Sequence, residues 1–203
     1  MESNRRFVFV IGPPGAGKGT LARILARTVR FAHISVGDLL RQVTSNPNTS
    51  SVVRGYVERG ELLPSEYLFP ILRARFRECA SDQPIVLDGF PRQLNQALEF
   101  EREFGEPVAV LFFNCPRDLA KFRVLSRQAG RAGDTSEVFD RRFDEYMLLT
   151  PAILYYYHRE KRKLVEVDTS GNTEVSYGNM TQALTRCDQW IQLMADDLLQ
   201  RGW

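Results

Sequence analysis

Short, mostly apolar segments alternate with longer segments of helical periodicity along the chain. The short segments cover residues 7–11, 33–35, 84–88, 108–114 and 164–167. Apolar runs of this length, bounded by turn residues, are typical of buried strands. Between them, apolar residues recur at three- and four-residue spacing, as in Leu21, Ile24 and Leu25. This spacing predicts helices that each bury one face.

The helices predicted by this periodicity cover residues 21–29, 36–43, 51–59, 65–80, 92–104, 118–128 and 173–200, and a further helix begins after Thr135 or Ser136. Pro151 is expected to kink that helix or split it near Thr150, because proline lacks an N–H group. The apolar stripe of the last helix consists of Met180, Leu184, Cys187, Ile191, Met194 and Leu198. A stripe of this kind usually packs on the chain's own sheet.

Strands that alternate with helices predict an α/β fold, with a parallel sheet covered on both faces. The active crevice is then expected at the carboxyl ends of the strands. The helices between residues 33 and 80 have little strand between them, so we interpret them as an inserted helical arm. We expect one domain over residues 1–203.

The first strand leads into a glycine-rich turn that contains a lysine. Residues 12–18 fit the pattern G-x-x-x-x-G-K of a phosphate-binding loop. The glycines allow successive N–H groups to point at phosphate oxygens, the helix N-terminus adds partial positive charge, and Lys18 adds a full one. Most such loops continue with Ser or Thr, whereas here Gly19 precedes Thr20. A magnesium ion is therefore expected to be held mainly by other groups.

The third predicted strand ends in a carboxylate, and the sequence that follows it is Asp88-Gly89-Phe90-Pro91-Arg92. Asp88 is placed to face magnesium across from the phosphate loop. ATPases commonly continue with Glu to activate water, but here Arg92 stands where a base would be needed. A GTPase is disfavoured because the segment is not D-x-x-G and N-K-x-D does not occur.

Composition and charge add little to this picture. The chain has 203 residues, 43% of them hydrophobic, and a net charge of +2, which does not require a nucleic acid or an anionic membrane. Basic side chains are concentrated locally, at Arg123, Arg127, Arg131, Arg141 and Arg142. This concentration suits a compact polyanion. The three cysteines have no paired spacing, so we expect neither disulfides nor a zinc site, and we expect a cytoplasmic location.

Three segments together resemble the nucleoside monophosphate kinases, the family of adenylate kinase and UMP/CMP kinase. They are residues 12–20, residues 35–41 (Ser-Val-Gly-Asp-Leu-Leu-Arg) and residues 88–92. The resemblance implies a P-loop NTPase-type parallel five-stranded sheet with helices on both faces. It also implies an arm that binds the monophosphate, about residues 36–77, and a short lid without zinc, about residues 127–138.

The resemblance further assigns roles to individual residues. The triphosphate donor would be held by Gly15, Ala16, Gly17, Lys18, Gly19, Thr20, Arg123, Arg127 and Gly171. The acceptor would be held by Val36, Arg41, Glu61, Leu62, Leu63, Gly89, Phe90, Arg92, Gln96, Arg131 and Arg142. Catalysis would rest on Lys18, Asp88, Arg92, Arg127, Arg131 and Arg142, with Asp88 holding Mg²⁺ through water. His33 and His158 lie outside these segments and are interpreted as structural, and Arg141 as a surface charge.

The family resemblance implies transfer of the γ-phosphoryl group of ATP to AMP, by a monomer that binds neither nucleic acid nor membrane. Gln96 favours AMP because relatives that use AMP have Gln there, and its amide can both donate to and accept from adenine. Val36 is ambiguous, since adenylate kinases usually have Thr and pyrimidine kinases Ala. The lid also departs from the family, because Gly133-Asp134 stands where two aspartates are expected.

Three alternatives stay open. The first is a UMP/CMP kinase of the same family. The second is a phosphate-loop kinase that acts on an alcohol, which would need a base where Arg92 stands. The third is a non-catalytic relative that binds nucleotide and regulates a partner, against which Lys18, Asp88 and the arginine set argue.

Overall fold

The computed structural model describes residues 5–127, 134–161 and 163–200. In these residues, a parallel sheet is built from β1 (Phe7–Ile11), β2 (Ala32–Ser35), β3 (Ile85–Asp88), β4 (Ala109–Asn114) and β5 (Leu164–Asp168). The five strands are ordered β2-β3-β1-β4-β5. The predicted five-stranded α/β fold is confirmed. The neighbouring strands β1, β2 and β3 lead into the three signature segments.

β1 lies at the centre of the sheet, and all five of its residues are buried. Because side chains alternate along a strand, Phe7 and Phe9 enter the hydrophobic core on one face of the sheet, and Val8 and Val10 enter the core on the other. This two-sided burial explains why the strand is apolar without interruption.

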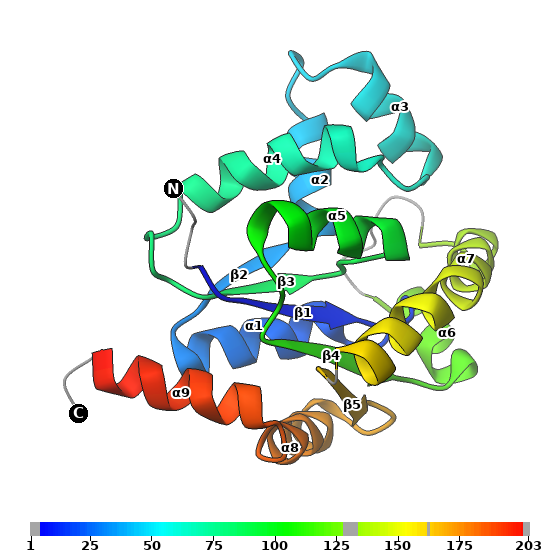
Figure 1. Ribbon diagram of the computed structural model, residues 1–203. Coiled ribbons are helices and arrows are strands. Elements are labelled where there is room, and N and C mark those ends of the chain that lie inside the picture. Colours follow the sequence, from blue (N-terminus) through cyan, green and yellow to red (C-terminus); the bar gives the residue numbers. More distant parts are fainter. Residues whose placement is uncertain (1–4, 128–133, 162, 201–203) are drawn as a thin grey trace.

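Helices cover both faces of the sheet (Figure 1). One face is covered by α1 (Lys18–Val29), α8 (Thr173–Leu184) and α9 (Asp188–Gln200), and the other by α4 (Ser65–Arg77), α5 (Leu94–Phe104) and the end of α7 (Ser136–Tyr155). The remaining helices are α2 (Val36–Thr44), α3 (Ser51–Arg59), α6 (Arg117–Leu125) and the π-helical turn η1 (Tyr156–Glu160). None of the helices described here is long and apolar enough to span a bilayer.

The core on the arm side of the sheet is rich in aromatic rings. Phe100 of α5 packs against the rings of Phe7, Phe9 and Phe90, with centroid distances of 5.0, 5.1 and 5.1 Å. Such tilted and edge-on pairs contribute beyond simple area burial. The cluster fixes the segment after β3, and with it the position of Arg92.

The predicted arm protrudes from the core as α2, α3 and the start of α4 (Figure 1). Its α3–α4 turn is made by Gly60, which has a left-handed φ of 70°. A Cβ atom on Gly60 would lie 3.0 Å from a guanidinium nitrogen of Arg141 on α7. Arg141, predicted to be an unremarkable surface charge, therefore reaches from α7 to the arm.

The prediction of one helix over residues 173–200 is wrong. α8 ends at Leu184, and tight turns formed by Arg186 N–H to Ala183 and Cys187 N–H to Leu184 precede α9. The break shifts the buried face, so Trp190 and Leu193 are buried. In the predicted stripe, Ile191 and Leu198 are exposed instead.

Pro151 does not split its helix near Thr150. α7 continues through Pro151 to Tyr155 and then widens into η1. The hydroxyls of Tyr156 and Tyr157 both donate to the carboxylate of Glu101 on α5. The π-helical turn thus lets two adjacent tyrosines reach one acceptor.

Candidate active site

The phosphate loop follows β1, and its glycines are required by close packing. A Cβ atom on Gly15 would lie 2.1 Å from the carbonyl oxygen of Ala120, and one on Gly12 would lie 2.6 Å from that of Phe113. Gly17 begins α1 in a left-handed conformation, and no side chain caps the helix. The first N–H groups of α1 are therefore available to phosphate oxygens.

Lys18 lies over this loop. Its ammonium group donates to the carbonyl oxygens of Gly12 at 2.8 Å and Pro13 at 2.7 Å. Desolvation lowers the pKa of Lys18 to about 8; Asp88 opposes this shift, and Arg92 and Arg127 reinforce it. A desolvated ammonium group surrounded by other cations is stabilised by an incoming polyanion.

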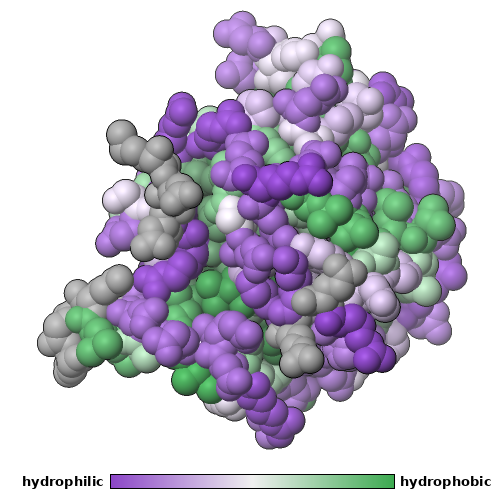
Figure 2. All heavy atoms as spheres, in the orientation of Figure 1, coloured by the Kyte–Doolittle hydropathy of each residue, from purple (hydrophilic) through white to green (hydrophobic). Residues whose placement is uncertain are grey.

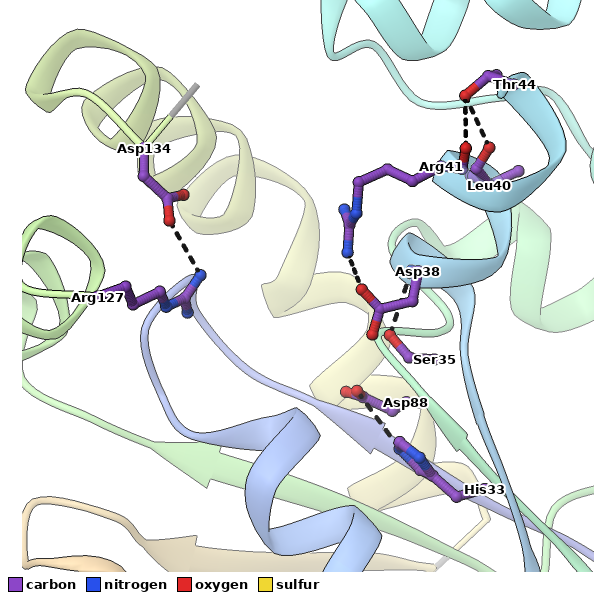
Figure 3. Close-up of polar contacts among 9 residues, drawn as sticks. All are labelled: His33, Ser35, Asp38, Leu40, Arg41, Thr44, Asp88, Arg127 and Asp134. Carbon is purple, nitrogen blue, oxygen red and sulfur yellow. Dashed lines mark hydrogen bonds and ion pairs between the residues drawn. The ribbon is translucent and has the colours of Figure 1, made fainter. Parts of the chain in front are cut away.

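Asp88 ends β3 beside the start of α1. It is only 5% exposed, and its Oδ2 lies 3.3 Å from the position that a Cβ on Gly19 would occupy. The glycine after Lys18 thus leaves room for the carboxylate. Asp88 Oδ2 also lies 3.7 Å from Nε2 of His33, which is buried without a hydrogen bond (Figure 3).

His33, predicted to be structural and outside the site, lies inside it next to Asp88. Its backbone belongs to β2, which pairs with β3 so that Ser35 stands beside Asp88. Side chains two residues apart on a strand share a face. Strand order, which the sequence alone did not provide, would have indicated this contact.

Arg92 extends from the segment after β3 and donates through Nε to the carbonyl of Gly89 at 3.2 Å. Arg92 is exposed by surface area, but neighbouring protein atoms displace part of the water around its guanidinium group. This desolvation lowers the pKa of Arg92, the positive charges of Arg142 and Arg41 lower it further, and Glu145 and Asp88 oppose the shift. Arg41 and Arg142, two of the predicted acceptor residues, therefore lie near Arg92.

Arg41 reaches the site from α2. Ser35 caps this helix by accepting from the N–H of Asp38 at 3.4 Å, and the Asp38 carboxylate pairs with Arg41 (Figure 3). Both side chains of the pair are 45% exposed, so the pair orients Arg41 without burying its charge. The sequence analysis did not assign this role to Asp38.

Arg127 reaches the site from the opposite side, after α6 (Figure 3). Its guanidinium lies 3.5 Å from the carboxylate of Asp134, which is 8% exposed. Of the two aspartates expected in the lid, the one that is present, Asp134, thus stands next to a lid arginine. Arg131 and Gly133 lie outside the described residues, so their assigned roles remain predictions.

Arg123 and Gly171 are brought together as the family resemblance implies. The guanidinium of Arg123 donates to the carbonyls of Gly171 and, at 2.7 Å, Thr169. These bonds tie α6 to the turn after β5. They hold one edge of the planar guanidinium group in place, next to the end of the sheet where the phosphate loop lies.

Gln96 is 2% exposed and already hydrogen-bonded within the protein. Its Oε1 accepts from the backbone N–H of Arg92 at 3.1 Å, and its Nε2 donates to the carbonyl of Leu63 at 3.2 Å. The amide thus joins a residue predicted to hold the acceptor phosphate to a segment predicted to hold its base.

Other predicted acceptor residues are less directly placed. The ring of Phe90 is fully buried in the aromatic core, and Val36 is 3% exposed within the same core. Glu61 is exposed and forms a two-bond ion pair with Arg59. Leu62 is half-buried beside the buried Leu63.

Taken together, the described groups suit phosphoryl transfer between two bound polyanions. Cations converge on the phosphate loop from three directions: Lys18 from the loop, Arg92 and Arg41 from the arm side, and Arg127 from the lid side. One buried carboxylate, Asp88, lies among them. The described residues hold no cluster of three or more side chains that could bind a metal by themselves.

Comparison with known proteins agrees with this geometry. A family model described as adenylate kinase matches residues 10–162. Uridylate kinase of Saccharomyces cerevisiae is 33% identical over 183 residues, which cover 87% of this chain and 89% of the relative. Adenylate kinase 1 of Schistosoma mansoni is 30% identical over 185 residues, covering 89% and 93% of the two chains. UMP-CMP kinase 2 of Oryza sativa subsp. japonica is 33% identical over 172 residues, covering 84% and 70%.

The match spans the phosphate loop, the arm and the segment after β3, and these are the elements that carry the cations and the carboxylate described above. Sequence motifs, sheet topology and family model lead to one assignment: the chain belongs to the adenylate kinase family of nucleoside monophosphate kinases.

Proposed function

We propose that this kinase transfers the γ-phosphoryl group of ATP to AMP, giving two ADP. The observation that carries the choice of AMP is Gln96. Its amide has two acceptor positions and two N–H groups, and the bonds to Arg92 and Leu63 use one of each. One donor and one acceptor remain, which match the amino group and neighbouring ring nitrogen of adenine.

In the proposed reaction, an oxygen of the AMP phosphate attacks the γ-phosphorus, and the bond to the β–γ bridging oxygen breaks. The attacking oxygen is already an anion, so no proton has to be removed. The protein's contribution is to hold two polyanions in line and to offset the charge that moves between them. Lys18 would serve the transferring group, Arg92 and Arg41 the acceptor, and Arg127 the donor.

The residues beside the phosphate loop fit a magnesium ion bound with ATP. Asp88 lies at the start of α1, where Gly19 leaves it space. Mg²⁺ prefers oxygen ligands and usually keeps several waters, with one or two carboxylates and substrate phosphates. Asp88 would hold the ion through water, and the ion would neutralise charge on the β- and γ-phosphates.

The test compares kcat/KM for AMP, CMP, UMP and GMP with ATP saturating. We expect AMP to be preferred, and Gln96→Asn to lower kcat/KM for AMP by about tenfold or more, because a shorter amide loses a buried hydrogen bond. The loss for CMP should be smaller. Gln93→Asn makes the same change three residues earlier and should leave the ranking unchanged. A preference for CMP or UMP in the unchanged protein would contradict the choice of AMP and leave the kinase assignment standing.

The second candidate is a UMP/CMP kinase, and Val36 is the residue that favours it. Valine cannot supply the hydroxyl that adenylate kinases usually have at this position, a difference of about 0.5–1.5 kcal/mol for one hydrogen bond. Several of the similar proteins also carry uridylate or UMP-CMP kinase names. A non-catalytic nucleotide-binding relative is the third candidate, and absence of turnover with all four monophosphates would support it.

A further inference from the structure

The distal half of α7 carries an apolar stripe on its outer face. Its members recur at spacings of one helical turn: Met147, Leu148, Pro151, Ala152 and Tyr155. Leu148 is 78% exposed, Tyr155 63% and Met147 57%, and the two small residues between them are also exposed. In Figure 2, hydrophobic atoms gather at the right-hand side of the molecule, over α7.

The stripe is not the face that holds α7 to its own fold. Thr150 and Ile153 are the buried residues in this part of the helix, and Ile153 belongs to the core on the arm side. With 3.6 residues per turn, both point away from the middle of the stripe. Apolar side chains that are exposed together on one helix face are typical of an interaction surface.

We propose that the stripe is a docking surface for a second copy of this chain, with the two α7 helices antiparallel across a twofold axis. If the axis passes between Pro151 and Ala152, those two residues face each other. Leu148 of one copy then faces Tyr155 of the other. Small residues at the crossing point let the helices approach, and the large residues on either side fill the space that remains.

The charges at the two ends of the stripe complement each other in this arrangement. Asp144 lies one turn before Leu148, and Arg159 lies four residues after Tyr155 in η1. Because a π-helical turn is wider than an α-helical turn, Arg159 stays close to the line of the stripe. Antiparallel pairing places Asp144 of one copy opposite Arg159 of the other, and symmetry makes this pair twice.

Both charges are available for this pairing. Asp144 and Arg159 are exposed, and neither forms a hydrogen bond or an ion pair within the part of the chain described here. Asp144 also attracts Arg117 of α6, whose guanidinium pairs with Asp140. They lie on the rim of the proposed contact, so they would select the antiparallel orientation more than they would add affinity.

A second exposed apolar face, on α9, does not suit self-association equally well. Its exposed members are Ile191, Leu198 and Leu199. The charged residues of α9 are all acidic, namely Asp188, Asp196 and Asp197. Pairing α9 with itself would place like charges together, whereas α7 offers one charge of each sign.

The proposed contact between the two α7 helices is small, so we expect the dimer to be weak. Interfaces below about 1,200 Å² in total are typical of weak or transient complexes. We therefore expect a reversible dimer with a dissociation constant on the order of 10–100 µM, in place of the monomer that the family resemblance implies.

Sedimentation velocity on the full chain, from about 1 to 300 µM, tests the proposal across this range. The unchanged protein should shift from monomer to dimer. Leu148→Glu should raise the dissociation constant at least tenfold, because it buries a charge in the apolar contact. Leu199→Glu, the same change on a similarly exposed leucine of α9, should leave the constant unchanged. Circular dichroism and turnover establish that both variants are folded.

Charge reversal then tests the orientation. Asp144→Arg alone and Arg159→Asp alone should each weaken the dimer, because each brings like charges together twice. The variant that carries both changes should recover the dissociation constant to within about twofold. A protein that stays monomeric over the whole range overturns the proposal and leaves the stripe to a different partner. A dimer that Leu199→Glu dissociates and Leu148→Glu does not also overturns it.

Discussion

Lys18 carries a full positive charge in a desolvated position. Its pKa of about 8 results mainly from desolvation, although Asp88 raises it. In the ligand-free protein, Lys18 therefore loses its proton as the pH rises above 8. A bound triphosphate favours the charged form, so binding above pH 8 must take up a proton.

Above pH 8, we expect the dissociation constant for ATP to rise with pH, approaching tenfold per pH unit before the pKa of the bound state is reached. Isothermal titration with a non-hydrolysable ATP analogue at pH 7, 8, 9 and 9.5 measures this. Lys18→Arg should remove most of the pH dependence, since arginine stays protonated throughout. If the dissociation constant of the protein with Lys18 stays the same from pH 7 to 9.5, Lys18 does not take up a proton when the triphosphate binds.

At the residue scale, the sequence located the groups that belong to short motifs. Lys18, Asp88 and Arg92 could be found because each stands at a fixed place after a strand. The contacts between distant residues could not be found in this way. His33 lies beside Asp88 only because β2 pairs with β3 in one register. Likewise, the internal hydrogen bonds of Gln96 depend on Leu63, 33 residues away.

At the scale of elements, the arm packs against α7 where Gly60 faces Arg141. Gly60 ends α3 with a φ of 70°, and Arg141 lies where its Cβ would be, at 3.0 Å. Arg141 also lowers the pKa of Glu61 beside it, although less than Arg59 does. The contact places a positive charge of α7 against the segment predicted to hold the acceptor base.

Gly60→Ala should therefore have two effects. The left-handed backbone should cost about 1 kcal/mol in the free energy of unfolding. The new methyl group should also displace Arg141, which we expect to raise KM for the acceptor two- to fivefold, with KM for ATP unchanged. Gly105→Ala is the control for destabilisation, because Gly105 also has a positive φ, 91°, but no atom lies within 4 Å of its Cβ position. With a ψ of 167°, Gly105 has a backbone conformation that is essentially restricted to glycine, so alanine is expected to cost at least as much stability there as at Gly60.

Gly105→Ala should lower the stability at least as much as Gly60→Ala and leave KM for the acceptor unchanged. In an Arg141→Ala background, Gly60→Ala should no longer change KM for the acceptor. If Gly105→Ala raises that KM equally, the effect comes from global destabilisation and Arg141 has no positioning role.

The existence and order of the elements followed from periodicity. The end of α8 at Leu184 and the end of α7 at Tyr155 did not. Residues 173–200 keep an apolar repeat through Cys187, so the pattern shows no break there. The break arises because tight turns around Thr185 and Arg186 rotate α9 until Trp190 packs on Phe31, with ring centroids 5.9 Å apart. Tertiary packing of a large aromatic side chain thus outweighed the local repeat. Similarly, α7 passes through Pro151 and widens only where two tyrosines reach Glu101.

On the scale of the whole molecule, positive charge is concentrated where the two halves of the site meet, although the net charge is only +2. Arg127 comes from the lid side and Arg41 from the arm (Figure 3). Lys18 comes from the phosphate loop at the start of α1. Each cation alone would bind phosphate. All of these cations can act on one transferring phosphoryl group only when both polyanions are bound.

This arrangement leads to a prediction about water. The described site residues include no carboxylate placed as Glu would be after Asp88 in an ATPase, since Gly89 follows it. Closure around both nucleotides would exclude water at the time when the cations are in place. We therefore expect phosphoryl transfer to a monophosphate to exceed ATP hydrolysis by at least about a thousandfold in kcat. Phosphate release and ADP formation, measured in parallel with and without AMP, give the two rates.

Lys18→Met supplies the control for that comparison. Removing the ammonium group should lower transfer by about a hundredfold or more, as is typical when one group that stabilises transition-state charge is lost. Residual hydrolysis should fall by a similar factor, because both reactions develop charge on the same γ-phosphoryl oxygens. If hydrolysis in the unchanged protein is as fast as transfer, or if only transfer depends on Lys18, water reaches the γ-phosphate by a route that the cations described here do not control.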